Sequence, residues 1–116
     1  MTAPIDLDHL DQYICGDAAL LDEVLTIFEE QALSWVEKLV PSLDDEQWAH
    51  AAHSLKGASR GVGAWAVGDL AEEAESLVGD DAVEKRAALV LKLAVETQAA
   101  VEFARKVRDG EGTKLA

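Results

Sequence analysis

The residues of this chain that could do chemistry gather around His53, in a stretch whose apolar residues recur at helical spacing. This spacing predicts an amphipathic helix. His53 stands two residues before the apolar Leu55, about 200° away around such a helix, so its ring is expected to face solvent. The other residues expected beside it on that side are His50, Ser54, Lys56, Gly57 and Arg60.

An exposed imidazole flanked by cations is suited to phosphoryl transfer. Neutral imidazole is a good nucleophile near pH 7, because its unperturbed pKa is about 6.5, and a ring nitrogen can carry a phosphoryl group. Lys56 and Arg60 would place positive charge near the phosphoryl oxygens. Gly57 costs a helix about 1 kcal/mol relative to alanine. This cost is understandable if another protein must approach the imidazole closely.

The segment His53-Ser54-Leu55-Lys56-Gly57-Ala58-Ser59, followed by Gly63, resembles the signature of histidine-containing phosphotransfer (HPt) domains of bacterial and plant-type phosphorelays. The similarity extends over roughly residues 5–80. It implies an all-α fold, an up-down-up-down four-helix bundle, with the phosphorylated histidine exposed on the second bundle helix. It also implies a surface for partner proteins around His53, formed by His50, Ser54, Gly57 and Arg60, with Lys56 beside the reacting group.

The resemblance also implies a role for Glu75. HPt domains often have glutamine or glutamate at this place, where it bonds the imidazole Nδ1, fixes the tautomer and leaves Nε2 free to attack. A glutamate resembles the phosphotransfer domain of chemotaxis-type kinases. The alternative is that Glu75 is one more surface carboxylate, like its neighbours Glu72 and Glu73.

Helix start and stop signals divide the chain into a short N-terminal helix and four longer ones, with no strand pattern. The expected ranges are 6–14, 17–40, 44–62, 64–78 and 82–109. Asp6 and Asp17 are candidate N-caps, and Asp44 with Gln47 forms a candidate capping box. Pro41 should end the second helix. Short loops make successive helices antiparallel neighbours, so we expect one domain over 1–116 with its core at about 6–109.

Several expectations concern packing. In the last helix, two adjacent apolar stripes are predicted to face the core, one made of Val83, Ala87, Val90, Ala94, Val101 and Ala104, the other of Leu89, Leu93, Ala100, Phe103 and Val107. The three tryptophans, Trp35, Trp48 and Trp65, are expected to anchor the core or its boundary. His9 is expected to be solvated, residues 1–5 to be a disordered lead, and residues 111–116 to be a frayed tail.

Composition limits the possible functions. The chain has 116 residues and a net charge of −13, which argues against nucleic acid and against an anionic membrane surface. It has one cysteine, which excludes an internal disulfide. No apolar run reaches the roughly 18–20 residues of a membrane span, and no secretory signal is visible. The expected location is therefore the cytoplasm.

The function predicted is that of a phosphorelay intermediate. His53 would take a phosphoryl group from a receiver domain, for instance in a hybrid histidine kinase, or directly from a kinase, and pass it to the receiver aspartate of a response regulator. No glycine-rich GxxxxGK loop is present and no length remains for an ATP-binding domain, so the chain is expected to be a phosphocarrier and not an enzyme by itself. We expect a monomer without a cofactor, with Mg²⁺ belonging to the receiver.

Two alternatives remain open. His50 and His53, with Glu46 one turn earlier, could ligate a metal ion on one helix face, although Lys56 and Arg60 nearby would oppose a cation. The second alternative is a helical bundle that binds partners without transferring phosphate. The sequence mark of such a bundle would be the loss of the histidine or the lysine, and both are present.

Overall fold

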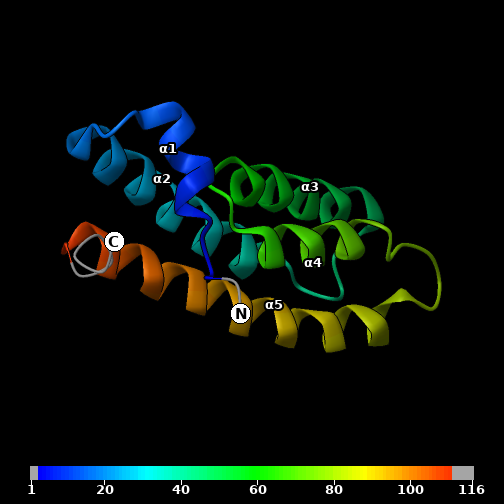
Figure 1. Ribbon diagram of the computed structural model, residues 1–116. Coiled ribbons are helices and arrows are strands. Elements are labelled where there is room, and N and C mark those ends of the chain that lie inside the picture. Colours follow the sequence, from blue (N-terminus) through cyan, green and yellow to red (C-terminus); the bar gives the residue numbers. More distant parts are fainter. Residues whose placement is uncertain (1–2, 111–116) are drawn as a thin grey trace.

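A computed structural model describes residues 3–110 of the chain, which form five α-helices and, within that range, no strand. The helices are α1 (Leu7–Ile14), α2 (Ala18–Lys38), α3 (Asp45–Gly61), α4 (Trp65–Glu75) and α5 (Ala82–Arg108). Helices α2 to α5 close a bundle in which α2 and α4 each contact both α3 and α5 (Figure 1). Helix α1 packs on α2, as the predicted extra helix. The predicted all-α bundle is confirmed.

Three of the five predicted helix starts are confirmed by side-chain caps, whereas α4 and α5 begin without one. The carboxylates of Asp6, Asp17 and Asp44 each accept a hydrogen bond from the backbone N–H three residues later. Such bonds satisfy donors that lack a partner inside the helix. At the other ends, α2 stops at Lys38, shortly before Pro41, whereas α4 stops at Glu75, three residues earlier than expected.

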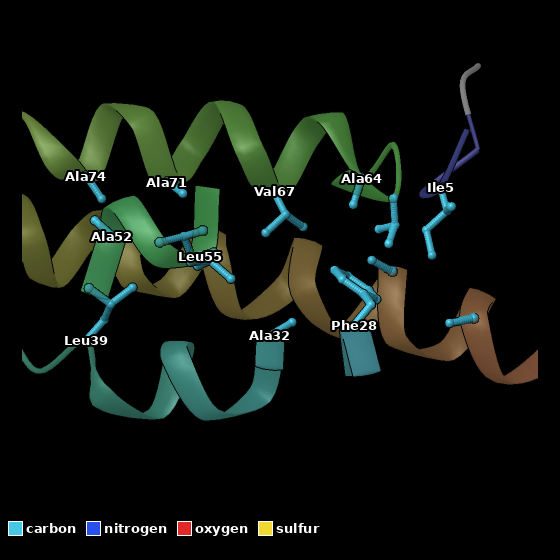
Figure 2. Packing of buried hydrophobic residues seen from close by; sticks show 14 of the residues in the cluster. Ile5, Phe28, Ala32, Leu39, Ala52, Leu55, Ala64, Val67, Ala71 and Ala74 are labelled. Atoms are coloured by element: carbon cyan, nitrogen blue, oxygen red, sulfur yellow. The ribbon is translucent and has the colours of Figure 1, made fainter. Parts of the chain in front are cut away.

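Alanines allow α3 and α4, the pair with the most extensive contact in the bundle, to lie close together. Ala52 of α3 and Ala71 and Ala74 of α4 are fully buried and point into the shared core, which Leu55 and Phe28 fill (Figure 2). Small side chains permit close approach of two helices, since the distance between their axes depends on the side chains at the contact. The side chains on the outer edges of α3 and α4 can therefore meet.

One of the two stripes predicted in α5 is wrong in its first half. Val83 is 50% exposed, and Ala87 and Ala94 are also exposed. The buried face instead follows a 3-4 spacing that includes two polar residues, Arg86 and Thr97. Its members are Ala82, Arg86, Leu89, Leu93, Thr97, Ala100, Val101, Ala104 and Val107. A stripe chosen by hydrophobicity alone left out Arg86, although this arginine occupies a core position, and it took in the exposed Val83 and Ala87 instead.

The N-terminal end is also more ordered than expected. Ile5 is fully buried and belongs to the core, so the disordered lead does not extend to this residue. His9 is half-buried between the edges of Tyr13 and Trp65, with ring centroids 5.2 and 4.9 Å away, and is not solvated. Residues 1–2 and the predicted frayed tail 111–116 lie outside the described residues. The single-domain organisation over 1–116 stays a prediction.

The tryptophans take different places. Trp48 is fully buried, Trp35 is half-buried, and Trp65 is 40% exposed. The Trp65 indole N–H donates to Asp6 Oδ2 at 3.1 Å, and this bond, followed by the backbone N–H of His9, lowers the pKa of the Asp6 carboxyl.

Over residues 3–110, no helix combines the length and apolar character needed to cross a membrane.

Gly63 joins the N-terminal segment to the turn between α3 and α4. Its carbonyl accepts from Asp6 N at 2.9 Å, its φ is +80°, and a Cβ added to it would lie 2.9 Å from Asp6 Cβ. We therefore expect Gly63→Ala to lower the free energy of unfolding by about 1–3 kcal/mol, measured by urea denaturation. The control is Gly61→Ala. A Cβ at this position meets open space, so this substitution should stabilise the helix. Equal stability of the two variants would contradict the prediction.

Candidate functional site

His53 lies in the middle of α3 with its side chain 65% exposed. Its neighbours Ala52 and Leu55 are fully buried on the inner face of the same helix. The predicted orientation of the ring towards solvent is therefore confirmed. A side chain on a regular helix keeps one outward direction, so the ring is accessible from solvent without rearrangement of this chain.

A carboxylate from α4 holds the inner nitrogen of this ring. Glu75 Oε2 lies 3.1 Å from His53 Nδ1, and the other oxygen, Oε1, accepts from Lys56 Nζ at 2.8 Å. An ionised carboxylate can only accept hydrogen bonds, so Nδ1 must be the donor of this pair. In the neutral ring the lone pair then lies on Nε2. The geometry thus selects the tautomer whose nucleophilic atom is Nε2.

Lys56 keeps that carboxylate charged. The hydrogen bond from Lys56 is the largest cause that lowers the pKa of Glu75; burial opposes it, and the bond to His53 adds to the lowering. The pKa of Glu75 therefore lies below its ordinary value, which favours the ionised carboxylate that accepts from Nδ1. The Lys56 side chain is only 19% exposed, so its charge acts first on Glu75. Sequence reasoning had placed this charge on the phosphoryl oxygens.

The surface next to His53 is open at Gly57. A Cβ added there would meet nothing within 4 Å, so packing within this chain does not require glycine. Ser54 is half-exposed beside His53, whereas Ser59 is fully buried and therefore a packing residue. Space at Gly57 fits the prediction of a close approach by a partner.

Arg60 is not a free cation. Its guanidinium bonds Glu72 at 3.1 Å and Asp69 at 3.5 Å on α4, and the bond to Glu72 is the main cause that raises its pKa. Its side chain crosses Gly68, where an added Cβ would lie 2.8 Å from Arg60 Cγ. The two carboxylates offset the charge that the sequence assigned to the phosphoryl group. A contact of Arg60 with a partner stays a prediction.

His50 belongs to a groove that sequence reasoning missed. Its ring meets Trp35 of α2 edge-to-face, with centroids 5.6 Å apart, and the Lys38 ammonium lies 4.5 Å from the centre of the Trp35 ring. The groove, of about 680 Å³, lies between the end of α2 and the start of α3. The sequence signal for it was weak, with Trp35 near the end of one helix and His50 in the first half of the next.

The residues of the metal alternative do not gather into a site. His53 is bonded to Glu75 and His50 packs against Trp35. Within residues 3–110, no group of three histidine, cysteine or acidic side chains is placed to hold a metal ion. The Nδ1 atom of His53 faces the Glu75 carboxylate, which orients the ring.

Comparison with known families decides which kind of bundle this is. The Hpt domain family matches the chain over residues 18–104, a range that contains His53, Lys56 and Glu75 and leaves out α1. The chain belongs to the Hpt domain family. The resemblance noted in the sequence is thereby confirmed. Hpt domains serve histidine phosphotransfer in two-component phosphorelays, where they interact with receiver domains and histidine kinases and have no ATP site of their own. No curated protein and no solved structure matches the chain.

Proposed function

We propose that this Hpt domain is a phosphorelay intermediate that carries a phosphoryl group on Nε2 of His53. The observation that carries the proposal is the exposed ring whose Nδ1 is held by Glu75 at 3.1 Å. The donor is the aspartyl-phosphate of a receiver domain or a histidine kinase, and the acceptor is a receiver aspartate. The second reading, a bundle that binds receivers without transfer, is an outcome of the test below.

The phosphoryl transfer to His53 needs no general base. The Nε2 lone pair attacks phosphorus, an N–P bond forms, and the bond between phosphorus and the aspartate oxygen breaks, with its electrons leaving on the carboxylate. Because Nε2 carries no proton, none has to be removed. The ring becomes a phosphoimidazolium whose positive charge is stabilised by the Glu75 carboxylate at Nδ1. In the forward step a receiver carboxylate attacks phosphorus and Nε2 leaves with its electron pair.

The partner completes this chemistry. Charge on the three phosphoryl oxygens must be neutralised in the transition state, and Lys56 and Arg60 are already paired with carboxylates. We therefore assign the neutralising Mg²⁺ to the acidic site of the receiver and no cofactor to this chain. His50, Ser54, Gly57 and Arg60 form the proposed docking surface. A cytoplasmic, monomeric carrier is part of the same proposal.

The direct test is transfer from phosphorylated receivers. Each receiver domain from the same source is labelled with radioactive phosphate on its aspartate, incubated with the chain, and separated from it. The expected result is acid-labile, alkali-stable label on the chain from at least one receiver. If receivers bind the chain but none transfers label to it, the binding-only bundle replaces the relay. No binding and no transfer would also overturn the proposal.

Glu75→Ala is expected to slow phosphorylation of His53 roughly 10- to 100-fold, the range known for the loss of a carboxylate that orients a metal-binding histidine. The same change should shift the tautomer away from Nδ1–H, measured by the ¹⁵N chemical shifts of the imidazole. The control is Glu73→Ala, which removes an exposed carboxylate from the same turn of α4. An unchanged rate together with an unchanged tautomer would remove the role from Glu75.

A further inference from the structure

Glu75 stands at a weak point of the bundle, because it is the last residue of α4. The final carbonyls of a helix have no partner inside the helix, and helix ends fray. The last turns of α4 hold Glu72, Glu73 and Glu75 and no basic residue. The C-terminal end of a helix carries a partial negative charge, so negative side chains there destabilise the helix. The α4 end therefore needs support from elsewhere if it is to hold a carboxylate against His53.

Trp48 supplies one support. Its indole N–H donates to the carbonyl of Ala74 at 2.7 Å, in the core, and the tryptophan is fully buried. Ala74 directly precedes Glu75, and Trp48 stands on the same helix as His53, five residues earlier. This bond therefore ties the backbone beside Glu75 to the helix that carries the imidazole. It fixes the register of α3 against α4 next to the site.

Arg86 of α5 supports Trp48 and the α4 end together. It is 2% exposed, and its guanidinium lies 4.5 Å from the centre of the Trp48 ring. Its Nε donates to the carbonyl of Leu77, just past α4, at 2.7 Å. Its other nitrogens are held by Asp45 Oδ1 at 2.7 Å and by the carbonyls of Pro41 and Leu43. A buried cation thus occupies the end of α4, where the sequence of α4 itself provides none.

We propose that Trp48, held in place by Arg86, positions the backbone of Glu75 for the bond of its carboxylate to His53. It touches neither the imidazole nor the phosphoryl group, and it acts through the Ala74 carbonyl. The inference rests on the proposed role of Glu75 in selecting the His53 tautomer. It adds that this selection depends on a side chain buried on the opposite face of α3.

The test is Trp48→Phe, which removes the N–H donor and keeps an apolar ring. The readout is the tautomer of His53 from imidazole ¹⁵N shifts, which needs no partner protein. We expect a smaller Nδ1–H population and, with an active receiver, phosphorylation about three- to tenfold slower, the effect of one hydrogen bond. The control is Trp65→Phe, which removes an indole bond to Asp6 at the start of α4, far along the helix from Glu75, and should change neither readout.

The same change in a Glu75→Ala background tests the route of the effect. If Trp48 acts through Glu75, Trp48→Phe should alter the tautomer in the wild-type chain and not in the Glu75→Ala chain. An unchanged tautomer in the first case, or an equal change in both, overturns the proposal. A chain that shows the tautomer effect but accepts phosphate from no receiver keeps the positioning role and loses the relay function.

Arg86→Lys is the second variant, in case Trp48→Phe does not fold. It keeps a buried cation but cannot reproduce the planar fork that reaches Leu77, Asp45 and the Trp48 ring. The expected result is a loss of Nδ1–H population in the same direction as for Trp48→Phe. A folded Arg86→Lys chain with the wild-type tautomer would contradict the role of Arg86 in holding Trp48.

Discussion

His53→Gln is expected to abolish the acid-labile phosphate that the wild-type chain takes up from a receiver. The lone pair of an amide nitrogen is delocalised into its carbonyl, so glutamine has no nucleophile to replace Nε2. Its NH₂ group can still donate to Glu75, and the position is 65% exposed. The stability of the bundle should therefore change by no more than about 0.5 kcal/mol.

The chain has three histidines, which makes the control direct. His9→Gln alters a half-buried ring at the N-terminal end, packed against Tyr13 and Trp65, and should leave phosphorylation intact. The measurement is radioactive label per chain before and after mild acid, with thermal unfolding of each variant to show that it folds. Label that survives in His53→Gln would place the phosphoryl group on another residue and overturn the site.

The sequence was informative where a feature depends on residues close together in the chain. The caps at Asp6, Asp17 and Asp44 were predictable because a side chain three residues before an amide lies within reach of it. The outward direction of His53 followed in the same way from the 3.6-residue period, with Leu55 as the reference. These features need no knowledge of the neighbouring helices.

Contacts between helices were less predictable. That Glu75 meets His53 depends on the register of α4 against α3, which no local pattern encodes, and only the resemblance to HPt domains suggested it. Lys56 and Arg60 are paired with carboxylates of α4, which changes the role expected of these two cations. Two residues that looked like free cations for a phosphoryl group are already bonded, so more of the charge neutralisation falls to the partner.

Arg86 shows why the α5 stripe was misassigned. An arginine is seldom buried unless its donors are satisfied. Here they are satisfied by the carbonyl of Leu77, nine residues away, and by those of Pro41 and Leu43, 45 and 43 residues away. The three carbonyls lie in or beside loops whose shape a sequence pattern does not specify. A stripe drawn by hydrophobicity therefore excluded the residue that joins the two loops at this end of the bundle.

Large side chains at Gly57 are expected to raise the stability of the chain and to slow phosphoryl transfer. In a helix, glycine costs about 1 kcal/mol relative to alanine, and a Cβ at this position meets no atom within 4 Å. The Gly57→Ala and Gly57→Leu chains should therefore fold correctly, and their thermal unfolding should occur at a higher temperature than that of the wild-type chain. Residues four apart lie on one helix face, so the leucine side chain would project beside His53 into the space of an approaching receiver.

The expected series is graded by size. Gly57→Ala should transfer phosphate at nearly the wild-type rate, Gly57→Leu about tenfold more slowly, and Gly57→Trp about a hundredfold or more, since each tenfold corresponds to about 1.4 kcal/mol of lost docking energy. The matched control is Gly61→Leu, which is also open on α3 but one turn further from His53. It should gain stability and keep its transfer rate. Full transfer by Gly57→Trp would mean that the receiver reaches His53 from another side, and the docking surface would then have to be drawn around the groove at Trp35 and His50.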